Sequence, residues 1–141
     1  MKILFLGDVF GKPGCISIEK NLKNIIQNKK IDFVIANGEN AANEGVGITE
    51  NISNKLFSSG VDVITTGNHV WDQKETASHI EREQRLLRPN NLLSGSPGKG
   101  FEIYNSKKGY KIGVLNLMGN IFMKKSDDAF IEANNFLKKI D

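Results

Sequence analysis

The chain has 141 residues, of which 39% are hydrophobic and 25% are charged, and its net charge is +3. These values fit one ordinary domain or most of one. They show neither the concentrated basic face of a dedicated nucleic-acid binder nor an apolar stretch near the roughly 20 residues that span a bilayer. The single cysteine, Cys15, cannot form an intrachain disulfide, and no signal-peptide core follows Met1. We therefore expect a cytoplasmic protein with no membrane contact.

The first half of the chain alternates short apolar runs with helical patterns. Residues 3–6 are continuously apolar, as in a buried parallel strand, and residues 11–14 form a Gly-rich turn. Two further strands are expected at 31–36 and 61–65. The helix before 31–36 carries an apolar stripe of Ile18, Leu22, Ile25 and Ile26. The next helix is capped by Thr49 and Gly60 and buries Ile52, Leu56 and Phe57. This strand–helix alternation predicts a parallel sheet.

The pattern changes in the second half. Residues 71–85 predict a polar helix that is largely exposed, and residues 88–100 predict a loop. Two strands at 101–105 and 110–118 predict a hairpin. A last helix is expected at 129–139, with Phe130, Ala133, Phe136 and Leu137 available for packing.

Polar residues follow each of the first three strands in the same way. The strand ends read Gly7-Asp8, Gly38-Glu39-Asn40 and Gly67-Asn68-His69. Ligands of open parallel sheets bind beyond the carboxyl ends of the strands. Two carboxylates at one such edge repel each other unless a proton or a cation lies between them. A divalent metal satisfies this arrangement, and Mn, Fe, Zn and Mg all suit the ligand set. The alternative is that these are the polar strand ends of any α/β protein.

These residues resemble a known superfamily. Gly67-Asn68-His69 resembles the Gly-Asn-His signature of the calcineurin-like metallophosphoesterases. Two departures from the superfamily pattern are typical of one subgroup, the YmdB-like phosphodiesterases: Asp8-Val9-Phe10 replaces Asp-x-His, and residues 37–40 read Asn-Gly-Glu-Asn instead of Gly-Asp-x-x-Asp. The resemblance extends to Ala41-Ala42, Trp71-Asp72, Arg88-Pro89 and 97–100, and covers essentially the whole chain.

The resemblance implies a fold and an activity. The fold would be α/β, a metallophosphoesterase-type α/β/β/α sandwich. The activity would be metal-dependent hydrolysis of 2′,3′-cyclic nucleotides with two divalent metal ions, Fe or Mn, with Mg and Zn as alternatives. The implied partners are small-molecule phosphodiesters, RNA-derived ends and a second copy of the chain. By the same resemblance, Asp8 and Asn40 would ligate the first metal, Glu39 would bridge both, Asn68 would ligate the second, and His69 would be the proton donor.

The family's remaining ligands are histidines from a later strand and from a Gly-x-His-x-His-like loop. This chain contains only His69 and His79. We therefore expect residues 1–141 to be the N-terminal portion of a single metallophosphoesterase domain that is incomplete at the C-terminus. The alternative is a catalytically inactive fragment with weak or no metal binding.

Two other functions fit the sequence less well. An aspartyl-phosphate phosphatase with Asp8 as nucleophile would need a second Asp where Phe10 stands, and a nucleotide-binding module would need Gly-x-Gly-x-x-Gly after the first strand, which is absent. We expect His79 to face solvent, Trp71 to pack, and Asp72 to cap the following helix rather than to orient His69.

Overall fold

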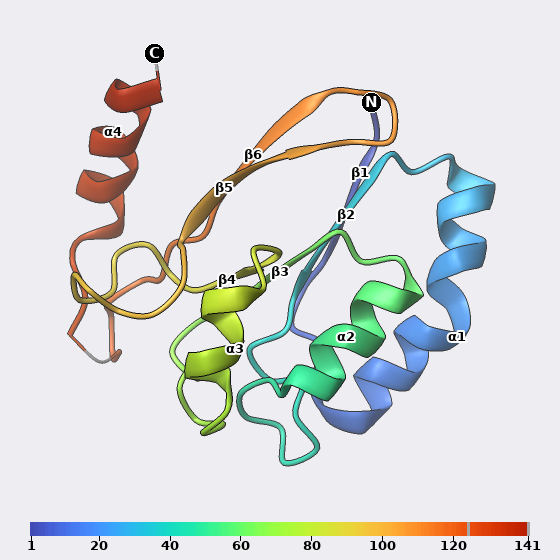
Figure 1. Cartoon of the computed structure of the whole chain (residues 1–141), viewed down its shortest axis with the longest axis horizontal. Coiled ribbons are helices and arrows are strands. Elements are labelled where there is room, and N and C mark those ends of the chain that lie inside the picture. The colour runs from blue at the N-terminus through green and yellow to red at the C-terminus, as the bar shows by residue number, and fades with distance from the viewer. Residues whose placement is uncertain (124, 141) are drawn as a thin grey trace.

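A four-stranded parallel sheet and a separate hairpin form the frame of the protein (Figure 1). The structure is a computed structural model that describes residues 1–123 and 125–140, without the side chain of residue 140. The parallel sheet has the order β1-β2-β3-β4 and the hairpin pairs β5 with β6 in antiparallel fashion. The strands are β1 (Ile3–Leu6), β2 (Phe33–Asn37), β3 (Val63–Thr65), β4 (Leu86–Leu87), β5 (Phe101–Asn105) and β6 (Lys111–Leu115).

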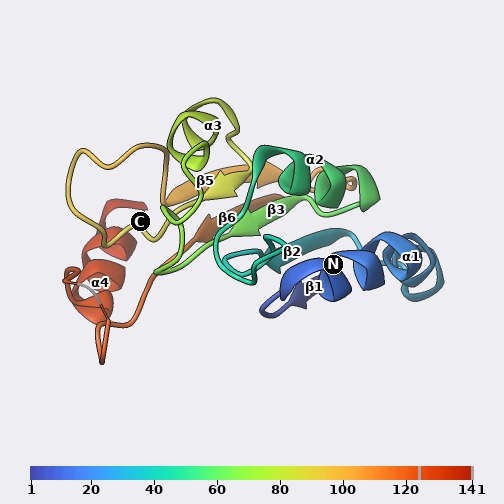
Figure 2. The ribbon, with the colours of Figure 1, turned by 90° about the horizontal axis from the view of Figure 1, so that it is seen from below.

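Helices cover one face of the parallel sheet, and the hairpin covers the other (Figure 2). On the helix side, Ile64 packs in one core with Leu22 and Leu56, which lie on α1 (Gly11–Lys29) and α2 (Glu50–Ser59). On the other side, alternate strand residues meet the inner face of the hairpin, because successive side chains of a strand point to opposite faces. This second core contains Phe33, Val63, Leu87, Ile112 and Val114.

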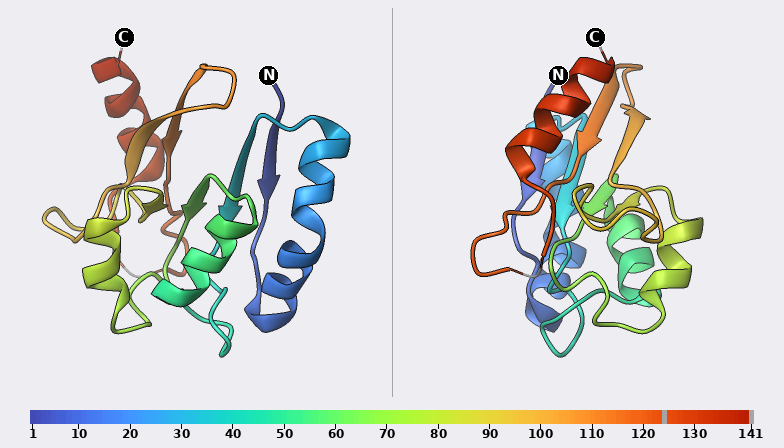
Figure 3. Two further views of the ribbon diagram at one scale, coloured as in Figure 1. Left: turned by 45° about the vertical axis from the view of Figure 1, so that its right-hand side comes forward. Right: turned by 90° about the vertical axis from the view of Figure 1, so that its left-hand side faces the viewer.

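The fourth helix, α4 (Ala129–Ile140), lies beside the hairpin and away from α1 (Figure 3). Its Phe136 ring packs on Phe101 of β5, with ring centroids 4.3 Å apart. Phe130 and Leu137 stay largely exposed, contrary to the prediction that they pack. The layers therefore run helices, parallel sheet, hairpin and α4. None of the helices within residues 1–123 and 125–140 is long and apolar enough to cross a membrane.

Strand β1 is not the fully buried strand that its apolar run predicted. Phe5 is 60% exposed and Ile3 45% exposed. Within the described residues β1 pairs only with β2, and the hairpin core is built on β2, β3 and β4. The hairpin does not cover the edge strand β1, so one face of this strand remains in solvent. The apolar pattern of a strand does not show which neighbouring layer covers it.

Helix α1 begins earlier than predicted. The expected turn at 11–14 is its first turn, which Gly11 enters with a φ of 53°. Pro13 is tolerated there because the first backbone N–H groups of a helix have no intrahelical acceptor. Ile18 and Leu22 are buried as expected, but Ile25 is exposed. The predicted caps of α2 are confirmed, since Thr49 Oγ1 accepts from Ile52 N at 3.2 Å and Gly60 is left-handed.

Helix α3 (Thr76–Arg82) is shorter and more buried than the predicted polar helix at 71–85. It crosses over from β3 to β4, a short strand that lies between the predicted helix at 71–85 and the predicted loop at 88–100 and was not predicted. Because β4 pairs in parallel with β3, the inner face of α3 must lie on the protein. Thr76, His79 and Ile80 are accordingly buried.

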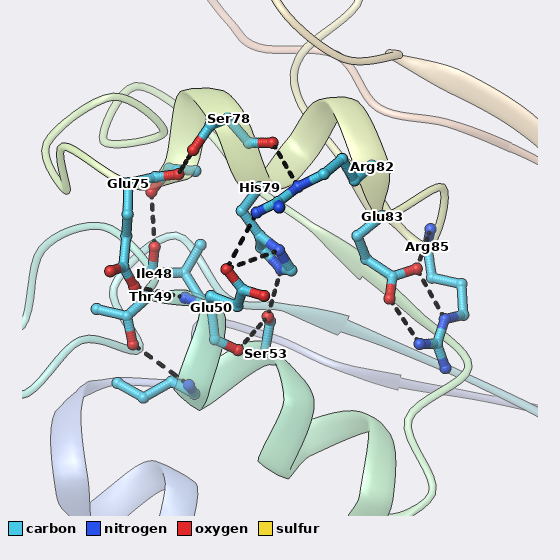
Figure 4. Close-up of polar contacts among 12 residues, drawn as sticks. Ile48, Thr49, Glu50, Ser53, Glu75, Ser78, His79, Arg82, Glu83 and Arg85 are labelled. Carbon is cyan, nitrogen blue, oxygen red and sulfur yellow. Dashed lines mark hydrogen bonds and ion pairs between the residues drawn. The ribbon is translucent and has the colours of Figure 1, made fainter.

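The prediction that His79 faces solvent is wrong (Figure 4). Its side chain lies between α3 and α2, with Nε2 2.8 Å from Ser53 Oγ and Nδ1 3.7 Å from Glu50 Oε2. Arg82 Nη2 lies 3.3 Å from the same Glu50 oxygen. The polar sequence around His79 suggested an exposed position. The side chain is buried against Ser53 and Glu50, which are also polar, so the pattern of apolar residues gives no sign of the contact.

Candidate functional site

The loops after β1, β2 and β3 are joined at the carboxyl edge of the sheet. Val9 N donates to Asn37 O at 2.9 Å, and Gly38 N donates to Thr65 O at 2.8 Å. These bonds continue the parallel ladder past the strand ends. The three turns therefore start from adjacent positions, where ligands of parallel sheets bind.

Asp8 and Asn40 face each other across the first two loops. Asn40 Nδ2 donates to Asp8 Oδ1 at 2.8 Å, and Gly11 N donates to the Asn40 carbonyl at 2.8 Å. Asp8 has a φ of 32°, a conformation that costs free energy for a residue with a Cβ and that clusters at functional sites. The local fold thus holds one carboxylate and one amide together at a backbone position that is strained.

Glu39 lies against Gly67. A Cβ added at Gly67 would be 2.0 Å from Glu39 Oε2, so only glycine leaves room for this carboxylate. Oε2 is buried and has no hydrogen-bond partner among the described residues. Buried carboxylate oxygens are normally paired because an unpaired one carries its full desolvation cost. Glu39 therefore has a free acceptor at the sheet edge.

Glu39 also lines a cavity of about 400 Å³ together with Asn37, Gly67 and Asn68. Asp8 and His69 are not among the described residues that line this cavity. Asn116, which the sequence analysis missed, lines it too and donates from Nδ2 to Thr66 O at 2.9 Å. The available signal was its place directly after β6, as Glu39 and Asn68 follow β2 and β3.

His69 is paired with Asp72. Nδ1 lies 2.6 Å from Asp72 Oδ2, and both side chains are about one-third exposed. The prediction that Asp72 caps the next helix is wrong, because α3 begins at Thr76 with Glu75 in the cap position. The tight turn that places Asp72 N 3.1 Å from His69 O brings the two side chains together. Trp71, expected to pack, is 36% exposed.

The predicted site residues thus form three groups at one sheet edge: Asp8 with Asn40, Glu39 with Asn68 on the cavity, and His69 with Asp72. Within residues 1–123 and 125–140 no cluster of three His, Cys, Asp or Glu side chains is close enough to hold a metal by itself. The donors are mostly carboxylate and amide oxygens, which suit hard divalent cations. The unpaired Glu39 oxygen fits such an ion.

Comparisons with known proteins identify the family of the chain. The family profile described as YmdB-like protein matches residues 4–141. The 2′,3′-cyclic-nucleotide 2′-phosphodiesterase of Bacillus subtilis (strain 168) is 42% identical over 137 residues, which are 97% of this chain and 51% of that protein.

Two crystal structures share the fold. A phosphatase from Mycoplasma pneumoniae superposes with a TM-score of 0.91 at 33% identity, over 100% of this chain and 52% of that one. A hypothetical protein from Thermus thermophilus superposes with a TM-score of 0.89 at 37% identity, over 99% of this chain and 53% of that one. The chain spans about half the length of these relatives. The predicted fold class, an α/β sandwich of the metallophosphoesterase type with a parallel sheet, is confirmed. The chain belongs to the YmdB-like protein family.

Proposed function

We propose that this chain serves the metal-dependent hydrolysis of 2′,3′-cyclic nucleotides. The observation that carries the proposal is the buried, unpaired Glu39 Oε2 at the edge where Asp8, Asn40 and Asn68 also lie. The name of the Bacillus subtilis relative supports the substrate class. Other small phosphodiesters, including RNA-derived ends, present the same group.

The proposed ligands divide as follows. Asp8 and Asn40 would hold one divalent ion, Asn68 a second, and Glu39 both, with Fe or Mn as the proposed metals and Mg or Zn as alternatives. When bound, such ions clamp the phosphate, acidify a water and stabilise charge on the attacking and leaving oxygens. Asp8 is held for this role by Asn40, whose Nδ2 donates to one carboxylate oxygen. The Oδ1 of Asn40 accepts no hydrogen bond from the described residues, so it can serve as a ligand.

His69 is the proposed proton donor. Because Nδ1 is engaged by Asp72, the ring is fixed and Nε2 is the nitrogen left to transfer a proton. Hydrolysis of the ester at the 2′ position requires a proton on the leaving 2′-oxygen. An imidazole suits that step near neutral pH. His69 would give this proton from Nε2, and the product would be a 3′-phosphate.

The test is hydrolysis of 2′,3′-cyclic AMP by the chain with Mn²⁺, beside Glu39→Ala and His69→Ala. We expect Mn²⁺-dependent release of 3′-AMP that Glu39→Ala abolishes together with metal binding. His69→Ala should lower turnover by about 10²–10⁴-fold and leave the metal content nearly unchanged. Wild-type turnover no higher than that of Glu39→Ala would contradict the proposal.

The second candidate is a protein without turnover. The observation that favours it is the scarcity of imidazole at the edge, since the chain has two histidines and His79 is buried between α2 and α3. This candidate predicts weak or no metal binding and no release of 3′-AMP.

A further inference from the structure

The cavity beside Glu39 has a second wall of different chemistry. Glu39 and Asn68 form the polar side, and the segment between β6 and the start of α4 forms the other. That second wall is largely apolar. Its residues include Leu117, Met118, Ile121, Met123, Ala129 and Phe130. The volume of about 400 Å³ is in the range of small-molecule sites, so the cavity has room for more than a phosphate group.

Two large apolar side chains on this wall are largely uncovered within the part of the chain that the structure describes. Ile121 is 77% exposed and Phe130 is 83% exposed, although both line the cavity. Scattered exposed apolar residues need no explanation, but apolar residues gathered at a concave site mark a ligand surface. An aromatic ring and a branched aliphatic chain offer flat and compact surfaces of the kind on which a heterocyclic base packs.

The second wall is anchored by the fold. The buried side chain of Asn91 holds both ends of the segment: Nδ2 donates to Met118 O at 2.7 Å and to Asp127 O at 2.8 Å, and Oδ1 accepts from Met118 N at 2.9 Å. Both the amide nitrogen and the oxygen of the Asn91 side chain are thus hydrogen-bonded. Because Asn91 lies four residues after the end of β4, these bonds connect the second wall to the parallel sheet. These bonds fix the wall at Met118 and at Asp127.

The charges that line the cavity indicate which end would hold the phosphate of a substrate. Asp128 lies on the same wall as Phe130 and accepts from Phe130 N and Ile131 N, both at 2.9 Å. A carboxylate at this end disfavours an anionic phosphate there. Under the proposed function the phosphate belongs instead at the end of Glu39 and Asn68, where a cation would offset its charge. The uncharged part of the substrate then faces the apolar wall.

We infer that Ile121 and Phe130 form the subsite for the base of a nucleotide substrate. This inference rests on the proposed function. It explains how the site would select nucleotides over simpler phosphodiesters, which the phosphate site alone does not do. Asn120 also lines the cavity and can offer its amide to the polar edge of the base. Ile121 and Phe130 contribute contact area, and they take no part in the bond-breaking step.

The test is equilibrium binding of three probes to the chain in the presence of Mg²⁺, by ligand-observed NMR. The probes are 3′-AMP, adenosine and inorganic phosphate. The double variant Ile121→Ala/Phe130→Ala should weaken 3′-AMP and adenosine by about 10-fold, the size of one lost base contact. Its affinity for inorganic phosphate should match that of the wild type. Both side chains are exposed, so the fold should tolerate their removal.

The matched control is Phe122→Ala/Ile131→Ala. These neighbours are also exposed, at 102% and 62%, and do not line the cavity, so this pair should bind all three probes normally. Absence of adenosine binding, or equal weakening by both pairs, would overturn the base subsite. If Glu39→Ala leaves phosphate binding unchanged, the proposed function is refuted. A selective loss of adenosine binding in Ile121→Ala/Phe130→Ala would still support the base subsite in that case.

Discussion

The position of the Glu39 carboxylate depends on the absence of a side chain at Gly67. The Glu39 carboxylate occupies the space that a side chain at residue 67 would fill, and its buried oxygen lacks a partner in the described part of the chain. Gly67 therefore provides space for the Glu39 side chain. It does not serve an unusual backbone angle, since its φ is not in the left-handed region.

A substitution at this glycine should separate metal binding from stability. In Gly67→Ala the new Cβ forces the flexible end of Glu39 to move, so we expect divalent-metal affinity to fall by about 10–100-fold. The melting temperature should change little, because the atom that yields is the tip of a flexible side chain. Calorimetric metal titration and thermal unfolding measure the two effects.

Gly7→Ala is the control, since a Cβ there meets nothing within 4 Å. Gly7 lies just after β1, and Gly67 lies two residues after β3. Gly7→Ala should keep normal metal affinity. Unchanged metal binding in Gly67→Ala would show that Glu39 is not a ligand.

At the scale of elements, α2 and α3 are joined by the buried pair of Ser53 and His79 (Figure 4). Ser53 Oγ also donates to Glu50 O at 2.9 Å, so the hydroxyl links the helix backbone to the imidazole. This contact fixes the crossover that follows the loop of Asn68 and His69.

Ser53→Ala should therefore destabilise the protein. It leaves the Nε2 of His79 buried without its partner, which costs about 1–3 kcal/mol of unfolding free energy. Ser58→Ala, which removes an exposed hydroxyl bonded to Asn54 O on the same helix, should cost much less. Urea unfolding of the two variants gives the comparison, and equal losses would mean that the His79 contact contributes nothing.

A polar contact at Asp32 ties the hairpin to the parallel sheet. Lys108 Nζ lies 2.8 Å from Asp32 Oδ1, and Lys2 N donates to Asp32 Oδ2 at 2.8 Å. The hydrogen bond from Lys108, followed by that from the Lys2 backbone, lowers the pKa of Asp32 below its ordinary value of 3.8.

This shift predicts a stability contribution that depends on pH. A lowered folded-state pKa means that the contribution is complete above the unfolded-state value and is lost as pH falls through the folded-state value. The stability difference between wild type and Asp32→Asn should thus be constant near neutral pH and shrink in acid below about pH 4. Thermal unfolding across pH measures it, and a difference that persists at the acid end would contradict the contact.

At the scale of the whole molecule, the edge of the sheet collects oxygen ligands but only one imidazole. His69 is at the edge and is paired with Asp72, whereas His79 is in the core. Carboxylate and amide oxygens hold a hard cation with water in the remaining positions, while tight binding of a second transition-metal ion would need more nitrogen ligands.

We therefore expect the chain to bind fewer than two Mn²⁺ ions tightly and to hydrolyse 2′,3′-cyclic AMP far more slowly than its Bacillus subtilis relative. Metal stoichiometry after gel filtration and parallel assays of both proteins check this. Two tightly bound ions and comparable turnover would show that the additional histidines of the family pattern are dispensable.

The sequence determined the parallel sheet, the caps of α2, the hairpin and the loops that carry Asp8, Glu39, Asn40, Asn68 and His69. Those features depend on local patterns, because apolar runs, capping residues and glycine turns act within a few positions. The resemblance to the YmdB-like family rested on the same short motifs. Their metal-binding and proton-transfer roles stay predictions.

Only the tertiary structure decided what each polar side chain meets. His79 and Asp72 have ordinary helical surroundings in the sequence, yet one is buried against Ser53 and the other holds His69. The exposed face of β1 and the apolar wall at Ile121 and Phe130 likewise depend on which layer covers which strand. Such contacts join residues far apart in the chain, and local periodicity contains no information about them.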